Sequence, residues 1–262
     1  MSAMSPSRPS PRNGAGEASP EGRFPFLKGF LPTSLIEWEG RLSCAVFLSG
    51  CNFRCPFCHA SDLVLRADAL DPIPFAAVAG HLDANRGWID GVVVSGGEAT
   101  LRPELPDLIE ALREHVPAVK LDTNGSHPAT VEALIEARLI DCVAMDVKAP
   151  LGEAYEEAAG VPVDCDAIRA TMDLLRGRGF PREFRTTVVP GLHTRDAIAE
   201  IARLLGPTET LILQQFAPLN CIDPAYLERR PYTRDQLREM AVATKGLVAA
   251  CRLRGELTSG RV

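Results

Sequence analysis

The spacing of hydrophobic positions changes repeatedly along the chain from Phe24 onward. Short runs of β-branched and aliphatic residues, typical of buried strands, alternate with longer segments in which apolar residues recur every three or four positions. This alternation predicts a parallel sheet whose strands are joined by amphipathic helices. The strands are expected at 45–49, 92–95, 119–122, 142–146, 184–189 and 211–215.

The segments with helical spacing carry apolar stripes, and several begin with a capping residue. Asp164 or Asp166 is placed to cap one helix, and Thr194 to cap the next. Thr233 followed by Gln236 has the form of a capping box, so a last helix is expected from there to about Leu253. The stripes consist of Leu101, Leu105, Leu108 and Leu112, of Val131, Leu134, Ile135 and Leu139, and of Ile168, Met172 and Leu175.

The alternation of strands and helices predicts an α/β fold of one domain over residues 23–262. We expect a partial (β/α)6 barrel of parallel strands that ends in a C-terminal helix. A flat, doubly wound sheet is the alternative, because periodicity alone does not separate the two. Residues 1–22 contain no aromatic or branched aliphatic side chain. They cannot bury enough apolar surface to offset the entropy of ordering, so a disordered N-terminal tail is expected.

Polar and glycine-rich segments follow the predicted strands, each at the carboxyl end of its strand. In parallel α/β folds, ligands bind at that edge of the sheet. Polar residues scattered over a surface would not favour one edge repeatedly, so this edge is the predicted site. The segments are 51–58, 96–98, 122–125, 146–148, 190–191 and 214–216.

Charge and composition exclude some classes of protein. The net charge is −6 and the chain has no dense stripe of Lys and Arg, which argues against a nucleic-acid partner. No stretch approaches the roughly 20 apolar residues of a membrane span. Near the N-terminus, Arg8 and Arg12 are followed by Ser, Pro and Gly instead of the apolar core of a secretion signal. A cytoplasmic protein without a membrane partner is expected.

Three of the eight cysteines lie close together in a loop that also contains Gly, Asn, Arg and Pro. Cys51, Cys55 and Cys58 have C-x₃-C-x₂-C spacing, which lets one loop hold a single iron–sulfur cluster. Three thiolates leave one iron of a [4Fe–4S] cluster open, as a catalytic metal site requires. The alternative is a zinc site with His59 or a distant cysteine as fourth ligand, although zinc sites favour paired C-x₂-C units. The isolated cysteines are expected to be small buried apolar side chains, and Cys221 is expected to be inert.

The cysteine loop, with aromatic Phe57 before its last cysteine, is followed after the next strand by Ser-Gly-Gly-Glu at 95–98. Together these motifs resemble the radical S-adenosylmethionine superfamily. Within it, the stretch 29–41 (GFLPTSLIEWEGR) leading into the cysteine loop is similar to activases of glycyl-radical enzymes, and most similar to the activating component of anaerobic ribonucleoside-triphosphate reductase. The resemblance covers residues 28–226. The family usually has Pro after the Glu of this motif, where this chain has Ala99.

The resemblance implies that a [4Fe–4S] cluster on Cys51, Cys55 and Cys58 binds the amino and carboxylate groups of S-adenosylmethionine. Reductive cleavage of the cofactor then gives a 5′-deoxyadenosyl radical. Gly96 and Gly97 would let the backbone approach the methionine moiety, and Glu98 would accept from its ammonium group. Phe57 would belong to the same cofactor site.

The resemblance also implies a monovalent cation beside the methionine carboxylate, held by Asp122, Thr123, the Ala144 carbonyl and Asp146. Lys148 and Arg185 match activase residues that reach the cofactor or the peptide, and they are the candidate catalytic residues. Each of these residues also has a purely structural alternative to a role at the cofactor. Asp122 could cap a helix or form a turn, Lys148 could form a surface ion pair, and Arg185 could be an outward, solvated side chain.

The function that the resemblance implies is abstraction of hydrogen from one glycine of a partner glycyl-radical enzyme, the anaerobic ribonucleotide reductase. A one-electron donor such as flavodoxin or ferredoxin would be a second partner. The first alternative is a radical enzyme acting on a small molecule such as a deazaguanine precursor. A different class, an iron–sulfur electron carrier, would leave 96–98 and 122–125 without a role.

Overall fold

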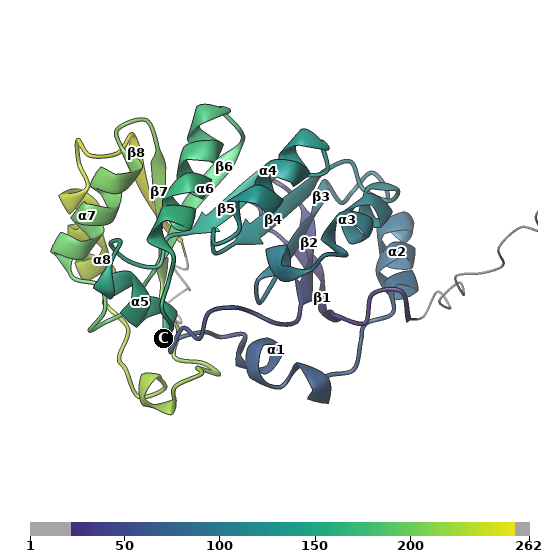
Figure 1. The fold of residues 1–262 in the computed structure, drawn as a ribbon, viewed down its shortest axis with the longest axis horizontal. Helices are drawn as coiled ribbons and strands as arrows, with labels where there is room; N and C mark the ends of the chain where they lie inside the picture. Colours follow the sequence, from purple (N-terminus) through teal and green to yellow (C-terminus); the bar gives the residue numbers. More distant parts are fainter. Residues whose placement is uncertain (1–21, 255–262) are drawn as a thin grey trace, which may run out of the picture.

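The computed structural model describes residues 22–254, so the predicted tail lies outside the described residues except for Gly22. Eight strands form one sheet and follow each other in chain order. The first pair is antiparallel and the later pairs are parallel. The first and last strands are not paired, so the sheet is an open, partial barrel (Figure 1). The strands are β1 (Leu27–Ser34), β2 (Ser43–Leu48), β3 (Gly91–Gly96), β4 (Val119–Thr123), β5 (Cys142–Asp146), β6 (Arg182–Val188), β7 (Thr210–Gln215) and β8 (Ala250–Arg254).

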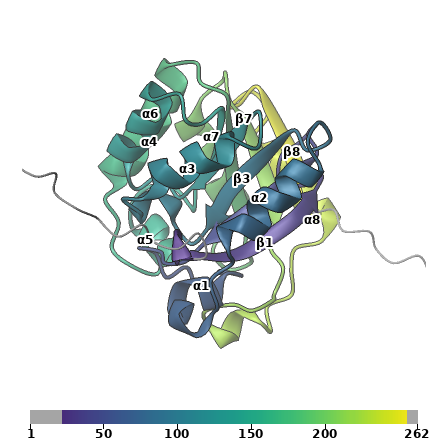
Figure 2. The same cartoon turned by 90° about the vertical axis from the view of Figure 1, so that its right-hand side faces the viewer.

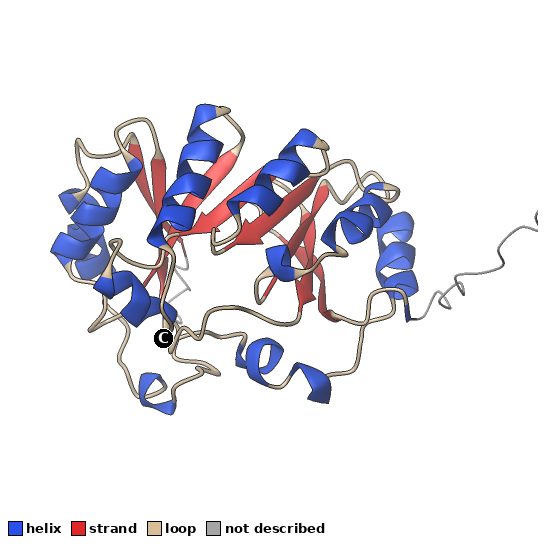
Figure 3. Ribbon diagram, in the orientation of Figure 1, coloured by secondary structure: helices blue, strands red, loops and turns tan. Residues whose placement is uncertain are grey.

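Helices connect the strands and cover the outer face of the sheet, as Figures 2 and 3 show. Short helices instead accompany the loops at the carboxyl ends of the strands, along the lower side of Figure 1. No described helix has the length and apolar character of a membrane span. The helices are α1 (Ser61–Leu65), α2 (Phe75–Ala84), α3 (Leu105–Arg113), α4 (Pro128–Glu136), α5 (Glu153–Ala159), α6 (Cys165–Gly177), α7 (Arg195–Leu205) and α8 (Arg234–Ala243), with the 3₁₀ turns η2 (Ala67–Ala69), η3 (Ala99–Leu101) and η4 (Pro224–Tyr226).

The predicted α/β class and partial barrel are confirmed, and all six predicted strands are present as β2 to β7. The flat alternative fails because a doubly wound sheet reverses its strand order, whereas this order is sequential. Three predicted caps are also present: the side chain of Asp164 accepts from the first turn of α6, Thr194 from α7, and Thr233 forms a capping box with Gln236 in α8.

The last predicted helix is wrong in its extent. It ends at Ala243 instead of continuing to about Leu253. Gly246 has a φ of +79°, a left-handed conformation that interrupts the helix, and the chain then forms β8. The alternation in Ala-Cys-Arg-Leu-Arg, with arginines at every second position, fits this strand. β1 was also not predicted, because Gly29 and Pro32 break its hydrophobic run.

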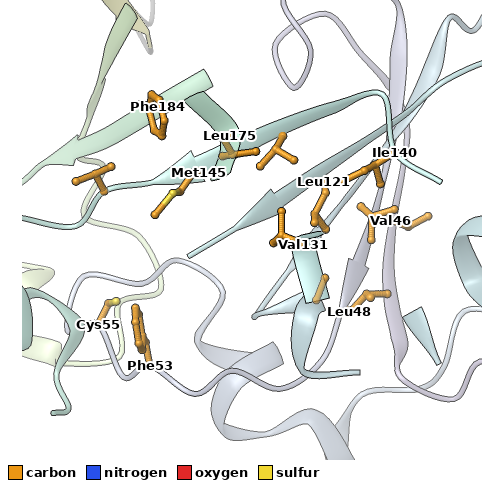
Figure 4. Packing of buried hydrophobic residues seen from close by; sticks show 14 of the residues in the cluster. Val46, Leu48, Phe53, Cys55, Leu121, Val131, Ile140, Met145, Leu175 and Phe184 are labelled. Atoms are coloured by element: carbon orange, nitrogen blue, oxygen red, sulfur yellow. The ribbon is translucent and has the colours of Figure 1, made fainter. Parts of the chain in front are cut away.

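The outer face of the sheet packs against the helices to form the main core (Figure 4). Val119 and Leu121 of β4 are fully buried in this cluster, as are Leu105, Leu108 and Leu112 of α3. Because side chains alternate across a strand, the intervening residues of β4 point to the inside of the barrel. The inner apolar cluster is much smaller and consists of Trp38, Ala45, Val93, Ala118 and Cys142.

Charged side chains from three strands also meet on the inner face. Lys120 of β4 has no exposed surface. Its Nζ donates to the carbonyl of Glu37 at 2.6 Å and to Glu183 Oε2 at 3.3 Å. Arg254 of β8 donates to the same Oε2 atom at 3.1 Å. These bonds connect the loop before β2 with β4, β6 and β8, and so hold the two sides of an open sheet together.

We expect Lys120→Met to destabilise the protein by about 3–5 kcal/mol, because removing one partner leaves the Glu183 carboxylate buried with less compensation. Thermal and urea unfolding measure this change. Arg178→Met is the matched control: Arg178 also contacts two carboxylates, Glu132 and Glu136, but on the surface, where about 0–1 kcal/mol is expected. Equal effects of the two substitutions would contradict the proposed importance of the buried charge.

Candidate active site

The three clustered cysteines lie on the loop that joins β2 to α1, at the carboxyl end of β2. Cys55 is buried, while Cys51 and Cys58 are half-buried. Figure 4 shows Cys55 and Phe53 together on this loop, at the edge of the core. Cys55 is close enough to both other thiols for them to affect its pKa, and burial raises that pKa to about 12. Burial also raises the pKa of Cys51 and of Cys58. Cluster binding therefore has to displace protons from these thiols.

A backbone hydrogen bond holds this loop against the end of α5, and a side-chain bond braces the loop internally. The Arg54 N–H donates to the Ala159 carbonyl at 2.8 Å, and the Arg54 side chain donates to the Cys51 carbonyl at 2.7 Å. Gly160 follows with a φ of +69°, and a Cβ there would lie 2.2 Å from the Arg54 carbonyl oxygen. The helix end and the cysteine loop thus fit only because residue 160 is glycine.

The geometry does not support the alternative of a single zinc ion. Within residues 22–254, no three His, Cys, Asp or Glu side chains converge in a way that could hold one metal ion. His59 Nε2 lies 2.6 Å from the Ala217 carbonyl oxygen, so this ring nitrogen is already engaged. Thiolates of an iron–sulfur cluster bind different irons and need not converge on one point, so this loop suits a cluster better.

Gly96 and Gly97, predicted as cofactor-binding residues, pack directly against the start of the cysteine loop. A Cβ on Gly97 would lie 1.9 Å from the Gly50 carbonyl oxygen, and one on Gly96 would lie 2.3 Å from backbone atoms of Leu48. The Gly97 and Glu98 N–H groups donate to the Leu48 and Gly50 carbonyls at 2.9 and 2.8 Å. The two glycines therefore bring the loops after β2 and β3 into contact, whatever they contribute to cofactor binding.

Glu98 is buried, with 1% of its surface exposed, and joins two loops of the site. Its carboxylate accepts from the Thr100 N–H at 3.1 Å, from Thr123 Oγ1 at 2.8 Å and from the Asn124 N–H at 2.6 Å. The structure thus places Glu98 and Thr123 in direct contact. Acceptance from the cofactor's ammonium stays a prediction, and in this geometry Glu98 fixes the loops after β3 and β4.

The remaining predicted residues meet on the inner face of β4, β5 and β6. Arg185 bridges two carboxylates: its Nε donates to Asp146 Oδ1 at 2.9 Å, and its Nη1 donates to Asp122 Oδ2 at 3.2 Å. Lys148 Nζ donates to Asp146 Oδ2 at 3.0 Å. Arg185 is 7% exposed, so it is not the outward, solvated side chain considered above, and Asp122 lies on β4 and caps no helix.

Asp146, Lys148 and Arg185 of this group are charged at neutral pH. Burial raises the pKa of Asp146, but Arg185 and Lys148 outweigh burial and hold this pKa well below its ordinary value. Burial lowers the pKa of Lys148 and of Arg185, yet the carboxylates beside them raise both above their ordinary values. The result is a compact ionic group at the carboxyl edge of the sheet.

One oxygen atom of this group is free to accept a hydrogen bond from a bound ligand. Asp122 Oδ1 is buried and has no hydrogen-bond partner among the described residues. Lys120 Nζ lies 3.9 Å from this oxygen, beyond hydrogen-bond distance. A buried carboxylate oxygen without a partner costs free energy, so a ligand that carries an N–H group would be favoured here. The ammonium group of a methionine moiety has that chemistry.

Several residues that hold the site were not predicted from the sequence. His193, fully buried, accepts from the Val189 N–H at 3.0 Å, and its Nε2 lies 2.7 Å from the Lys148 carbonyl oxygen. Arg102 donates to the Ser49 carbonyl, just before the cysteine loop. The roles of His193 and Arg102 are evident only from the contacts of their side chains. The one signal in the sequence is that they lie in the connections that follow β6 and β3. Phe57 is buried beside Tyr226, with ring centroids 6.5 Å apart, and its contact with a cofactor stays a prediction.

An open, mostly parallel barrel with a three-cysteine loop at its carboxyl edge defines a class of iron–sulfur enzymes that bind a small cofactor beside the cluster. The sequence profile of the radical SAM superfamily matches residues 46–205, which is more than half of the chain. The protein therefore belongs to the radical SAM superfamily. Its cofactors are accordingly a [4Fe–4S] cluster and S-adenosylmethionine. The cysteine loop suits the cluster, and the unpartnered Asp122 oxygen suits the ammonium group of S-adenosylmethionine.

Relatives of known sequence include several kinds of radical SAM protein. A protein of Methanocaldococcus jannaschii, provisionally named as a glycyl-radical enzyme activating enzyme, is 30% identical over 84% of this chain and 92% of its own length. A 7-carboxy-7-deazaguanine synthase of Hyperthermus butylicus is 28% identical over 69% of this chain and 72% of its own. A probable GTP 3′,8-cyclase of Thermococcus kodakarensis is 24% identical over 74% and 64%.

Solved structures show the same fold at low sequence identity. SuiB of Streptococcus suis, in its complex with the precursor peptide SuiA, superimposes with a TM-score of 0.61 and 16% identity, over 80% of this chain and 48% of SuiB. A domain of a pyruvate-formate lyase-activating enzyme of Bacteroides vulgatus superimposes with a TM-score of 0.51 and 16% identity, over 63% of this chain and 99% of that domain.

We expect Gly160→Ala to lower the iron content of the purified or reconstituted protein severalfold, because its Cβ would displace the Arg54 carbonyl and with it the cysteine loop. Iron and sulfide analysis with absorbance near 400 nm measures the loading. Gly179→Ala is the control: residue 179 has a similar φ of +58°, but nothing lies within 4 Å of a Cβ there. If both variants load the cluster equally, the close fit at residue 160 does not support the loop.

We expect acid to destabilise the fold through His193. Burial lowers its pKa below the ordinary 6.5, so the unfolded chain binds a proton that the folded chain excludes. This stabilisation is complete above about pH 6.5 and is lost as the pH falls below that value. His193→Gln, which can still donate to the Lys148 carbonyl, should lower the melting temperature at pH 7.5 and flatten its decline toward pH 5.5, relative to wild type. Parallel declines would show that His193 is not the titrating group.

Proposed function

We propose that this enzyme activates a glycyl-radical enzyme, and that its partner is an anaerobic ribonucleotide reductase. The observation that carries the proposal is the 30% identity to the Methanocaldococcus jannaschii protein, which extends over 92% of that protein. Similarity over nearly the whole length includes the segments outside the cysteine loop, where a substrate would be recognised. A second Methanocaldococcus jannaschii protein with the same provisional name is 25% identical over 60% of this chain.

The open side of the barrel is compatible with a protein substrate. Because β1 and β8 are not paired, the sheet does not close into a full barrel, and its backbone leaves one side without a strand. A pocket of about 560 Å³ lined by Trp38, Glu39, Arg182, Glu183 and Arg252 opens at the amino ends of the strands, away from the cysteine loop. It is therefore not the place where the radical would form.

The chain's own residues would bind and orient the cofactor. Cys51, Cys55 and Cys58 would hold the cluster, which when bound supplies the electron for cleavage of the sulfonium and release of a 5′-deoxyadenosyl radical. Asp122 Oδ1 would accept from the methionine ammonium, and Lys148 and Arg185 would face the methionine carboxylate. Asp122 and Arg185 are buried, so water would not screen their interactions with the cofactor.

A second candidate function is radical chemistry on a small molecule. The similarity to the 7-carboxy-7-deazaguanine synthase of Hyperthermus butylicus favours it, since 72% of that enzyme is covered at 28% identity. In that case a purine-like precursor, instead of a glycine of a protein, would lie beside the cofactor. The electron donor in either case would be a small one-electron carrier such as flavodoxin or ferredoxin.

The test uses the reconstituted, reduced protein with S-adenosylmethionine under anaerobic conditions. We expect 5′-deoxyadenosine release to rise at least about tenfold when an anaerobic ribonucleotide reductase is added, together with a glycyl radical detected by electron paramagnetic resonance on the reductase. Cys55→Ala, which lacks one cluster ligand, is the blank. If 5′-deoxyadenosine release does not change when the reductase is added but rises with a deazaguanine precursor, the second candidate function is favoured.

A further inference from the structure

The ionic group at the carboxyl edge consists of Asp122, Asp146, Lys148 and Arg185. It occupies the place where a monovalent cation is expected beside the cofactor. Two of the four predicted cation ligands, Asp122 and Asp146, contribute carboxylates. Between them lies a guanidinium: Arg185 donates to Asp146 at 2.9 Å and to Asp122 at 3.2 Å. The space that a cation shared by the two carboxylates would occupy is thus filled by a side chain of the protein.

The position of Arg185 is fixed by the sheet itself. Arg185 and Asp146 are directly paired in the register of β5 and β6, so the bridge follows from backbone hydrogen bonding. The Val147 N–H donates to the Arg185 carbonyl at 2.8 Å, which holds the backbone there. Arg185 is 7% exposed, and withdrawing its charge from both carboxylates would leave it buried without partners.

The charges in this group are already balanced. Asp122 and Asp146 carry two negative charges, and Arg185 and Lys148 carry two positive charges at short range. A third cation, Lys120, lies 3.9 Å from Asp122. Glu183, on the same face of β6, supplies no spare charge because Lys120 and Arg254 contact it at 3.3 and 3.1 Å. An added monovalent cation would meet repulsion from the guanidinium. The one carboxylate oxygen without a hydrogen-bond partner, Asp122 Oδ1, already has Lys120 Nζ at 3.9 Å, so a second cation there would be repelled by this ammonium as well.

We propose that the Arg185 guanidinium performs in this chain the task of a monovalent cation: it neutralises Asp122 and Asp146 and presents positive charge to the methionine carboxylate. Lys148 contributes a second positive group beside it. The enzyme then binds S-adenosylmethionine without a bound alkali ion. The inference rests on membership of the radical SAM superfamily alone, and it holds for a protein substrate and for a small molecule.

The experiment measures the Kd of S-adenosylmethionine for the cluster-loaded enzyme by anaerobic equilibrium dialysis. The buffer contains tetramethylammonium as its only bulk cation, and K⁺ or Na⁺ replaces it at constant ionic strength, so that screening does not change. For the wild type we expect the Kd to change by less than about twofold, since no alkali ion is linked to binding. A decrease of about tenfold or more with either ion would overturn the proposal.

Variants test whether the guanidinium is the responsible group. Arg185→Gln should raise the Kd about tenfold or more, and K⁺ or Na⁺ should recover at least about threefold of this loss by entering the vacated position. Arg185→Lys, which keeps the charge, should bind more tightly than Arg185→Gln and show no recovery. The control is Arg178→Gln, which removes an exposed arginine that also contacts two carboxylates and should leave the Kd unchanged.

A direct search for the ion gives a readout that does not depend on binding strength. Crystals of the cluster-loaded enzyme with S-adenosylmethionine, grown with thallium(I) in place of K⁺, should show no anomalous peak between Asp122 and Asp146. Crystals of the Arg185→Gln variant should show one there. A peak in the wild type, with Arg185 displaced, would refute the proposal whatever the binding data say.

Discussion

The site depends on one close contact between two stretches of backbone. The Gly50 carbonyl lies so near Gly97 that no Cβ fits between them, and it accepts the Glu98 N–H. This contact places the cysteine loop over the end of β3. Glu98 then reaches Thr123 and Asn124, so the position of the loop after β4 follows from the same contact. Two adjacent glycines often indicate a flexible segment. Here Gly96 and Gly97 instead allow the closest backbone approach in the site, which fixes the position of the cysteine loop.

The inside of the barrel is held together by charge, whereas the outside is held by apolar packing. Outer-face residues such as Val119 and Leu121 belong to one large cluster, but the inner apolar cluster has only five buried members among the described residues. Lys120, Glu183 and Arg254 continue the ionic group of Asp122 and Arg185 toward the amino ends of the strands. Each buried charge has to be paired, so the inner face would leave little freedom for the orientation of any cofactor group that bound there.

Hydrophobic spacing predicted β2 to β7 because each is a short apolar run, and the cysteine spacing predicted the cluster loop because ligands of one cluster are close in sequence. β1 was not predicted because a glycine and a proline interrupt its hydrophobic run. β8 was not predicted because arginines occupy alternate positions along it. The bridge made by Arg185, and the contact of His193 with Lys148, join residues that are distant in sequence. Their partners depend on strand register and loop packing, which no local pattern encodes.

The sequential strand order has a consequence for biogenesis. Each strand pairs with a neighbour that left the ribosome just before it, so the sheet can grow during synthesis. The cysteines emerge early, whereas two supports of their loop emerge much later: the Ala159 carbonyl, and Asp223, whose N–H donates to the Pro56 carbonyl at 3.0 Å. The nascent chain therefore exposes three unprotected thiols to oxidants before their surroundings exist. We therefore expect the cluster to be inserted late in synthesis or after chain release, when the supports of the loop are present.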